Sequence, residues 1–219
     1  MAAVFDKYTD LLNAIIARKG YTRYLEIGVQ NGHNLKAVEC QEKAGVDVWC
    51  ASPCEHHVLS DEFFRRCRSE QSPGWDLIFI DGDHRWLPAL RDIVNALEHL
   101  NPDGIIFVDN INPQMFDDQM LSGDGTVWKA WATLRVSRRD LFMVAIDRAR
   151  GWGIIRRGKQ ELYAHDEEPG GMPCYFGAQW ELDWPFFEEF RAELLNLVSE
   201  EEFVSSVFDR LCPPKVSCG

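Results

Sequence analysis

Apolar and polar residues follow one another along the chain in segments that predict helices and strands in turn. Residues 5–19 carry apolar side chains at helical spacing, and Gly20 is a suitable residue to end that helix. Short runs that are almost wholly apolar come next, as is typical of strands buried on both faces of a parallel sheet. These runs lie at residues 23–27, 46–50, 57–60, 76–81 and 105–109.

Segments with apolar residues at helical spacing lie between these runs, and a last pair of apolar runs follows them. Helices are expected at residues 33–43, from Asp61 onward with Ser60 as N-cap, and at 86–100, 127–134, 185–197 and 200–210. Residues 141–146 and 153–156 predict an antiparallel pair of strands. Strands that alternate with helices indicate an α/β fold. We expect a doubly wound, mostly parallel sheet of seven strands with helices on both faces.

The length of 219 residues fits one α/β domain with a full core. We expect that domain to span residues 1–160, with residues 161–219 adding a loop and helices that pack on it. Residues 163–184 are rich in glycine, proline and aromatic side chains, and they predict an irregular loop. Such a loop could cover a bound molecule, form an apolar flap over the sheet or make a contact in a homo-oligomer.

Charge and apolar content restrict the partners. The formal net charge of −12 disfavours phosphate backbones, so no nucleic-acid partner is expected. No run of eighteen apolar residues is present, so no membrane span is expected. The first residues lack the order of a signal peptide, and the seven cysteines are scattered in the manner of free thiols. These features predict a cytoplasmic protein.

The first strand ends in a candidate binding motif. Glu26 closes an apolar run, and Gly28 and Gly32 follow it in the pattern Glu-x-Gly-x-x-x-Gly. We expect Gly28 to make a sharp turn and Gly32 to let the backbone approach a ligand. The next helix should begin near His33 or Asn34 and direct its amide groups to the same place. The spacing differs from the dinucleotide fingerprint Gly-x-Gly-x-x-Gly, which argues against a dehydrogenase.

Two later strands also end in acids. Asp81 follows one apolar run within Asp81-Gly82-Asp83-His84, and Asp109-Asn110 follows the next. Because parallel strands bring their carboxyl ends to one edge of a sheet, these acids and the Glu26 loop should face one crevice. Strand-end carboxylates also cap turns, so each acid by itself is weak evidence for a site.

These motifs resemble the class I S-adenosylmethionine-dependent methyltransferases of the small-molecule, catechol O-methyltransferase-like type. The resemblance spans most of residues 20–158. It rests on the Glu26 motif and on several segments beyond it. They are Phe79-Ile80-Asp81-Gly82-Asp83-His84, Arg91-Asp92-Ile93, Leu100-Asn101-Pro102-Asp103-Gly104-Ile105-Ile106, Asp124-Gly125-Thr126-Val127-Trp128-Lys129-Ala130 and Gly153-Ile154-Ile155-Arg156-Arg157-Gly158.

The resemblance implies transfer of a methyl group from S-adenosylmethionine to an oxygen, less readily a nitrogen, of a small-molecule acceptor. The cofactor would contact the first loop, Asp61 near the adenine amino group, and the end of the second strand. The implied cofactor-binding residues are Glu26, Gly28, Asn31, Gly32, Ser52 and Asp61.

The resemblance also implies roles for the second group of acids. Metal-dependent members would hold Mg²⁺ with Asp81, Asp109 and Asn110, whose oxygens suit that ion. His84 stands at the offset of the family's catalytic lysine and is the expected base, acting beside Asp81. The alternatives are that Asp81 contacts the ligand without metal, and that His84 caps the following helix.

The second strand departs from the family pattern. Ser52 stands where an acid that grips the ribose diol is expected, with Glu55 as a stand-in. The link from the second strand to the third is also short. These departures leave open a second function class, a ligand-binding relative of the fold that has lost catalysis.

Overall fold

The protein folds around one seven-stranded sheet in the order β2-β1-β3-β4-β6-β5-β7. The computed structural model describes residues 5–49, 51–120, 123–148, 150–163 and 183–213. Only β6 runs against the other strands, so the sheet is mostly parallel, as the sequence predicts. The strands are β1 (Arg23–Ile27), β2 (Glu42–Val46), β3 (Trp75–Ile80), β4 (Leu100–Val108), β5 (Leu141–Ile146), β6 (Trp152–Arg157) and β7 (Leu197–Val198).

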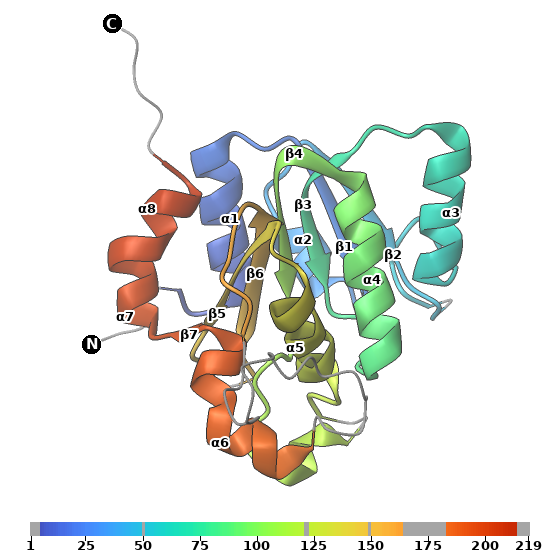
Figure 1. Ribbon diagram of the computed structural model, residues 1–219. Coiled ribbons are helices and arrows are strands. Elements are labelled where there is room, and N and C mark those ends of the chain that lie inside the picture. The colour runs from blue at the N-terminus through green and yellow to red at the C-terminus, as the bar shows by residue number, and fades with distance from the viewer. Residues whose placement is uncertain (1–4, 50, 121–122, 149, 164–182, 214–219) are drawn as a thin grey trace, which may run out of the picture.

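Helices cover both faces of the sheet, as Figure 1 shows. One face is covered by α3 (Ser60–Glu70), α4 (Trp86–His99), α5 (Val127–Ser137) and α6 (Trp184–Leu195). The other is covered by α1 (Tyr8–Lys19), α2 (His33–Ala37) and the C-terminal run of α7 (Glu200–Glu202), η2 (Phe203–Val207) and α8 (Phe208–Leu211). A short 3₁₀ helix, η1 (Phe116–Gln119), follows β4.

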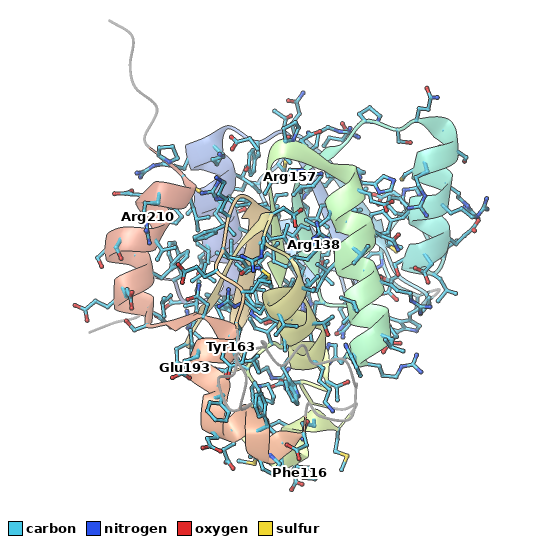
Figure 2. All side chains as sticks on the ribbon, viewed as in Figure 1. Phe116, Arg138, Arg157, Tyr163, Glu193 and Arg210 are labelled. Carbon is cyan, nitrogen blue, oxygen red and sulfur yellow. The ribbon has the colours of Figure 1, made fainter. Side chains whose placement is uncertain are left out.

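Successive side chains along the central strands point alternately into two separate hydrophobic cores. In β3, Ile78 and Ile80 join the core under α3 to α6, whereas Leu77 and Phe79 join the core under α1 and the C-terminal helices. Side chains fill the space between the sheet and both helical layers (Figure 2). Because β3 and the second half of β4 are buried on both sides, their sequences are nearly unbroken apolar runs, which is why these segments were predicted. Strand β4 itself begins at Leu100, five residues before the predicted run, and includes the exposed Pro102 and Asp103.

The C-terminal part of the described chain is tied to the sheet by specific contacts. The indole Nε1 of Trp131 in α5 donates to the Leu195 carbonyl at 3.1 Å. Arg135, which is buried, donates from Nε to the Leu194 carbonyl at 3.3 Å. Strand β7 then pairs with β5. Most of the predicted aromatic loop, residues 164–182, lies outside the described residues, as do residues 214–219.

The second strand was predicted in the wrong place. The run at 46–50 was expected to be the strand, but β2 ends at Val46, and Val48 and Trp49 are exposed. Strand β2 is an edge strand, so it tolerates the charged residues Glu42 and Lys43 that hid it in the sequence.

Two neighbouring predictions were also wrong. The helix expected at 33–43 is the single short helix α2, because β2 begins at Glu42. The strand expected at 57–60 is reduced to an isolated bridge between Val46 and His56. The seventh strand is β7 at the opposite edge. In addition, the N-cap of α3 is Leu59, and Ser60 is the first helical residue.

The register of the parallel strands collects four residues at one edge of the sheet. Ile27 pairs with both Val46 and Ile80, and Ile80 pairs with Val108. The residues that follow these four strand ends are Gly28, Asp47, Asp81 and Asp109. They lie where open α/β sheets bind their ligands. Within the described ranges, no helix is long and apolar enough to cross a bilayer.

Candidate active site

Gly28 lies against the backbone of the next strand. Its φ is +87°, so it makes the predicted sharp turn. A Cβ atom at this position would lie 2.0 Å from the Asp81 carbonyl oxygen. Gly32, at φ +70°, would place a Cβ atom 2.4 Å from Cγ of Pro53. In both cases the atom that excludes a Cβ belongs to the protein. Glycine is therefore needed at position 32 because of Pro53, and not because a ligand approaches the backbone as predicted.

Glu26 is a buried carboxylate held from one side. Its Oε2 accepts hydrogen bonds from the Tyr24 hydroxyl at 2.6 Å and from Asn34 Nδ2 at 2.7 Å. Burial raises the pKa of Glu26 to about 7, even though both hydrogen bonds favour the charged form. Helix α2 begins at His33, as predicted, and Glu26 and Asn31 both line a small hollow of about 100 Å³. A cationic group in that hollow would keep Glu26 ionised.

Asp47, not Ser52, is the acid at the end of the second strand. Its Oδ2 accepts from the backbone N–H groups of Val29 at 2.9 Å and Gln30 at 2.7 Å, and the carboxylate lines a cavity of about 430 Å³. Ser52 is buried and does not line that cavity. Glu55 accepts from the Gly45 N–H at 3.1 Å, so it holds β2 instead of reaching a ligand. Ser52 was predicted in place of Asp47 because the second strand was expected to end at residue 50, whereas β2 ends at Val46.

Three hollows meet at the strand ends. The 430 Å³ cavity lies on the β2 side, the 100 Å³ hollow lies beside Glu26, and a third cavity of about 760 Å³ opens beside α1. Gln30 and Asp81 line all three. Gln30 has φ +46°, a strained conformation for a residue other than glycine, which Asp47 stabilises through the Gln30 N–H. Molecules in the three spaces would therefore come together beside these two residues.

His84 is fixed at both ring nitrogens. Nδ1 lies 2.7 Å from the Gly123 carbonyl oxygen and Nε2 lies 3.1 Å from Asp81 Oδ1. Because a carbonyl oxygen only accepts, Nδ1 carries a proton and Nε2 is the atom able to exchange one. The hydrogen bond to Asp81 raises the pKa of His84 above its ordinary value. Asp83, between Asp81 and His84 in the sequence, accepts from Arg85 Nε and makes no hydrogen bond with His84 among the described residues.

Asp109 presents an unsatisfied buried oxygen near this group. Its Oδ1 has no hydrogen-bond partner among the described residues. Burial is the main cause that raises the pKa of Asp109 to about 7, and the charge of the nearby Asp81 carboxylate adds to it. Asn110 is buried at φ +65° and donates from Nδ2 to Asp124 at 3.1 Å, so the ligand atom that this side chain offers is Oδ1.

A cation would satisfy Asp109 and offset its repulsion with Asp81. The residues therefore fit the predicted Mg²⁺ set in type, although His84 already shares Asp81. Among the described residues, no three His, Cys, Asp or Glu side chains are grouped to hold a metal. The predicted Mg²⁺ set is not a group of that kind, because it has two acids, Asp81 and Asp109, and takes its third oxygen from Asn110.

Asp61 lines the 430 Å³ cavity, but neighbouring side chains already contact its carboxylate. Asn95 donates to its Oδ1 at 3.0 Å, and Arg91 Nε lies 3.5 Å from its Oδ2. Its side chain is 44% exposed. Both contacts hold Asp61 against α4, and its contact with the adenine amino group stays a prediction.

Three residues of the site were not predicted from the sequence. Asp47 was hidden by the wrong strand end, although its position directly after Val46 was a usable signal. Gln30 has no distinctive residue type. Tyr8 stacks on Phe79, with ring centroids 5.0 Å apart, and lines both the 100 Å³ and 760 Å³ spaces. The sequence showed it only as one apolar position of a helix.

The fold and the motifs agree with one family of proteins. Residues 19–111 match the profile of the family described as a methyltransferase domain. The chain has the class I methyltransferase fold. The predicted resemblance is thereby confirmed, and the methyltransferase match includes the Glu26 loop, Asp47, Asp81, His84 and Asp109. No curated protein matches the sequence.

Solved methyltransferase structures share this fold at low sequence identity. The O-methyltransferase TomG from Streptomyces achromogenes, in complex with S-adenosylmethionine, superposes with a TM-score of 0.55 at 17% identity, over 71% of this chain and 81% of TomG. An O-methyltransferase from Bacillus cereus with S-adenosylhomocysteine gives 0.55 at 14%, over 72% and 84%. The S-adenosylhomocysteine-bound methyltransferase PaMTH1 from Podospora anserina gives 0.54 at 17%, over 69% and 78%.

Proposed function

We propose that the protein is an enzyme that transfers a methyl group from S-adenosylmethionine to an oxygen, less readily a nitrogen, of a small molecule. The observation that carries this proposal is the meeting of three spaces at Gln30 and Asp81. A methyltransferase needs one space for a nucleoside, one for an amino acid and one for an acceptor, with the sulfonium at their junction. The methyltransferase fold supports the same reading.

Each space fits one part of the reaction. The 430 Å³ cavity takes the adenosine, and Asp47 keeps one lone pair of Oδ1 for a ribose hydroxyl, since among the described residues that oxygen accepts only from the Trp49 N–H. The 100 Å³ hollow takes the methionine end, where Glu26 faces the cationic amino group and Asn31 adds a polar wall. The 760 Å³ cavity, lined by Tyr8, His84 and other polar residues, takes the acceptor.

The chemistry needs positioning and one base. As the acceptor oxygen bonds to the methyl carbon, the bond from that carbon to sulfur breaks and S-adenosylhomocysteine leaves as a neutral thioether. The hydroxyl proton passes to Nε2 of His84, whose Nδ1–H is held by the Gly123 carbonyl. Binding both reactants in line supplies the remaining rate enhancement.

A ligand-binding relative without catalysis is the second candidate. The sequence favoured it for two reasons, Ser52 in place of the expected acid and the short link after the second strand. Asp47 removes the first reason, because an acid follows the end of β2 and lines the 430 Å³ cavity. The retained His84–Asp81 pair further supports the enzyme.

Replacing Asp47 tests the adenosine part of the site. We expect Asp47→Ala to weaken S-adenosylhomocysteine binding by roughly 10- to 100-fold, because it removes a charged hydrogen-bond acceptor and frees the strained Gln30 loop. Isothermal titration calorimetry measures this. Glu55→Ala, which removes the other acid near β2, should bind nearly as well as the parent. Equal affinities for the Asp47→Ala variant and the parent would contradict the assignment.

We further propose that Mg²⁺ supports the reaction, held by Asp81, Asp109 and the free oxygen of Asn110. When bound, the ion would make an acceptor hydroxyl more acidic. We expect Mg²⁺ to raise the melting temperature of the protein and excess chelator to remove activity. Asp109→Asn, which keeps the shape but removes a charge, should abolish the Mg²⁺-dependent thermal shift. Full activity in chelator, with no Mg²⁺-dependent thermal shift in the parent, would contradict this proposal. It would indicate that His84 alone offsets the charges of Asp81 and Asp109.

A further inference from the structure

A second buried carboxylate faces the 430 Å³ cavity from helix α4. Asp92 is 4% exposed and forms part of the cavity wall. Its Oδ1 accepts a hydrogen bond from the Ser60 hydroxyl at the start of α3. Its Oδ2 lies beside Gly82, another residue of the wall. Within the described part of the chain, no donor is hydrogen-bonded to that second oxygen.

Oδ2 of Asp92 is open to a donor from the cavity. Burial raises the pKa of Asp92 to about 6. Ser60 occupies only Oδ1, so Oδ2 keeps its lone pairs for a donor on the cavity side. The nearby donors Arg91 and Asn95 are directed to Asp61 instead. A molecule in the cavity that carries an N–H or O–H group can therefore donate to Asp92 Oδ2.

The adenosine of the proposed cofactor offers one suitable group. Asp47 faces the ribose, so the base occupies the rest of the cavity, toward Ser60 and Asp92. The ring nitrogens on the edge of adenine accept hydrogen bonds and would repel a carboxylate. The exocyclic amino group, in contrast, donates two.

We propose that Asp92, through Oδ2, accepts a hydrogen bond from the exocyclic amino group of adenine and is the residue that selects an adenine nucleoside. This inference rests on the proposed function. Ser60 positions Asp92 by holding its other oxygen. Asp61, which the family resemblance suggested for this contact, is half-exposed and acts as an anchor for Arg91 and Asn95.

The test combines a deletion in the ligand with a substitution in the protein. The ligands are S-adenosylhomocysteine and its 6-deamino purine analogue, which lacks only the amino group, and the readout is the ratio of their dissociation constants by calorimetry. We expect the parent to prefer the amino compound by roughly 10- to 100-fold, because the analogue cannot donate a hydrogen bond to the Asp92 carboxylate. In Asp92→Asn the ratio should fall to about 3 or less, since the uncharged amide loses less when unpaired.

Asp61→Asn is the matched control and should keep the ratio of the parent. A collapsed ratio in Asp61→Asn with an intact ratio in Asp92→Asn would overturn the proposal in favour of Asp61. A parent protein that binds both ligands equally would also overturn it. If Asp92→Asn does not fold, retention or loss of the ratio in Asp61→Asn decides. Failure of the parent to bind S-adenosylhomocysteine at all would instead contradict the proposed function, and this inference with it.

Discussion

Valine in place of Gly28 is expected to abolish cofactor binding. The residue has φ +87°, and its Cα faces the Asp81 carbonyl oxygen so closely that a Cβ atom would lie 2.0 Å from it. A β-branched residue cannot adopt this backbone conformation without strain of roughly 1–3 kcal/mol, even before the steric clash is counted. The ends of β1 and β3 would be forced apart where the three spaces meet.

Calorimetry with S-adenosylhomocysteine and thermal unfolding measure the two parts of this effect. We expect a lower melting temperature and no measurable binding for Gly28→Val. Gly158→Ala is the control for a tight contact alone, because a Cβ atom there would lie 3.0 Å from Cβ of Phe142, whereas Gly158 has no positive φ and lines none of the three spaces. A Gly28→Val protein with parental affinity and stability would show that this contact does not shape the site.

Loss of the His84 ring is expected to lower turnover by roughly 10²- to 10⁴-fold, the usual contribution of a general base. Nε2 of His84 is the protonatable atom at the wall of the acceptor cavity, since Nδ1 is held by the Gly123 carbonyl at 2.7 Å. His84→Ala removes it, whereas cofactor affinity should change little because His84 lines neither the 430 Å³ nor the 100 Å³ space. Methyl incorporation into a hydroxylated acceptor found by screening measures turnover.

The pH dependence separates a base from a structural role. Only the neutral imidazole accepts a proton, and Asp81 raises the pKa of His84, so the rate should rise with pH through that raised pKa. His84→Gln is the matched variant, because its amide can keep a hydrogen bond but cannot take a proton. We expect it to be as slow as His84→Ala and to lose this rise. Parental turnover in either variant would remove His84 from the mechanism.

The sequence predicted the central strands and their acids because burial on both faces leaves a clear record. Strands β3 and β4 are apolar runs, and Asp81 and Asp109 are the polar residues that end them. Their meeting at one edge follows from parallel pairing alone. Helix α4 was predicted almost to the residue, because its apolar positions repeat at helical spacing.

The edge strand left no such record. Glu42 forms an ion pair at 2.7 Å with Arg23, its register partner in β1, and Lys43 donates to the Leu35 carbonyl at 2.7 Å. The segment therefore resembles a loop in the sequence, and Asp47 was passed over in favour of Ser52.

Contacts between distant segments could not be predicted from the sequence either. Gly28 meets the Asp81 backbone, and Ser60 donates to Asp92, 32 residues further along the chain. No spacing rule encodes such pairs, because each depends on how two elements pack in space.

The central claim is that the strand-end cavities hold S-adenosylmethionine, and calorimetry of the parent protein with S-adenosylmethionine and S-adenosylhomocysteine tests it most directly. The account predicts that one molecule of either ligand binds per chain and that the two compete for one site. It also predicts that Asp47→Ala weakens both, while Glu55→Ala weakens neither. Folded parent protein that gives no binding heat and no thermal shift with either ligand would contradict the claim.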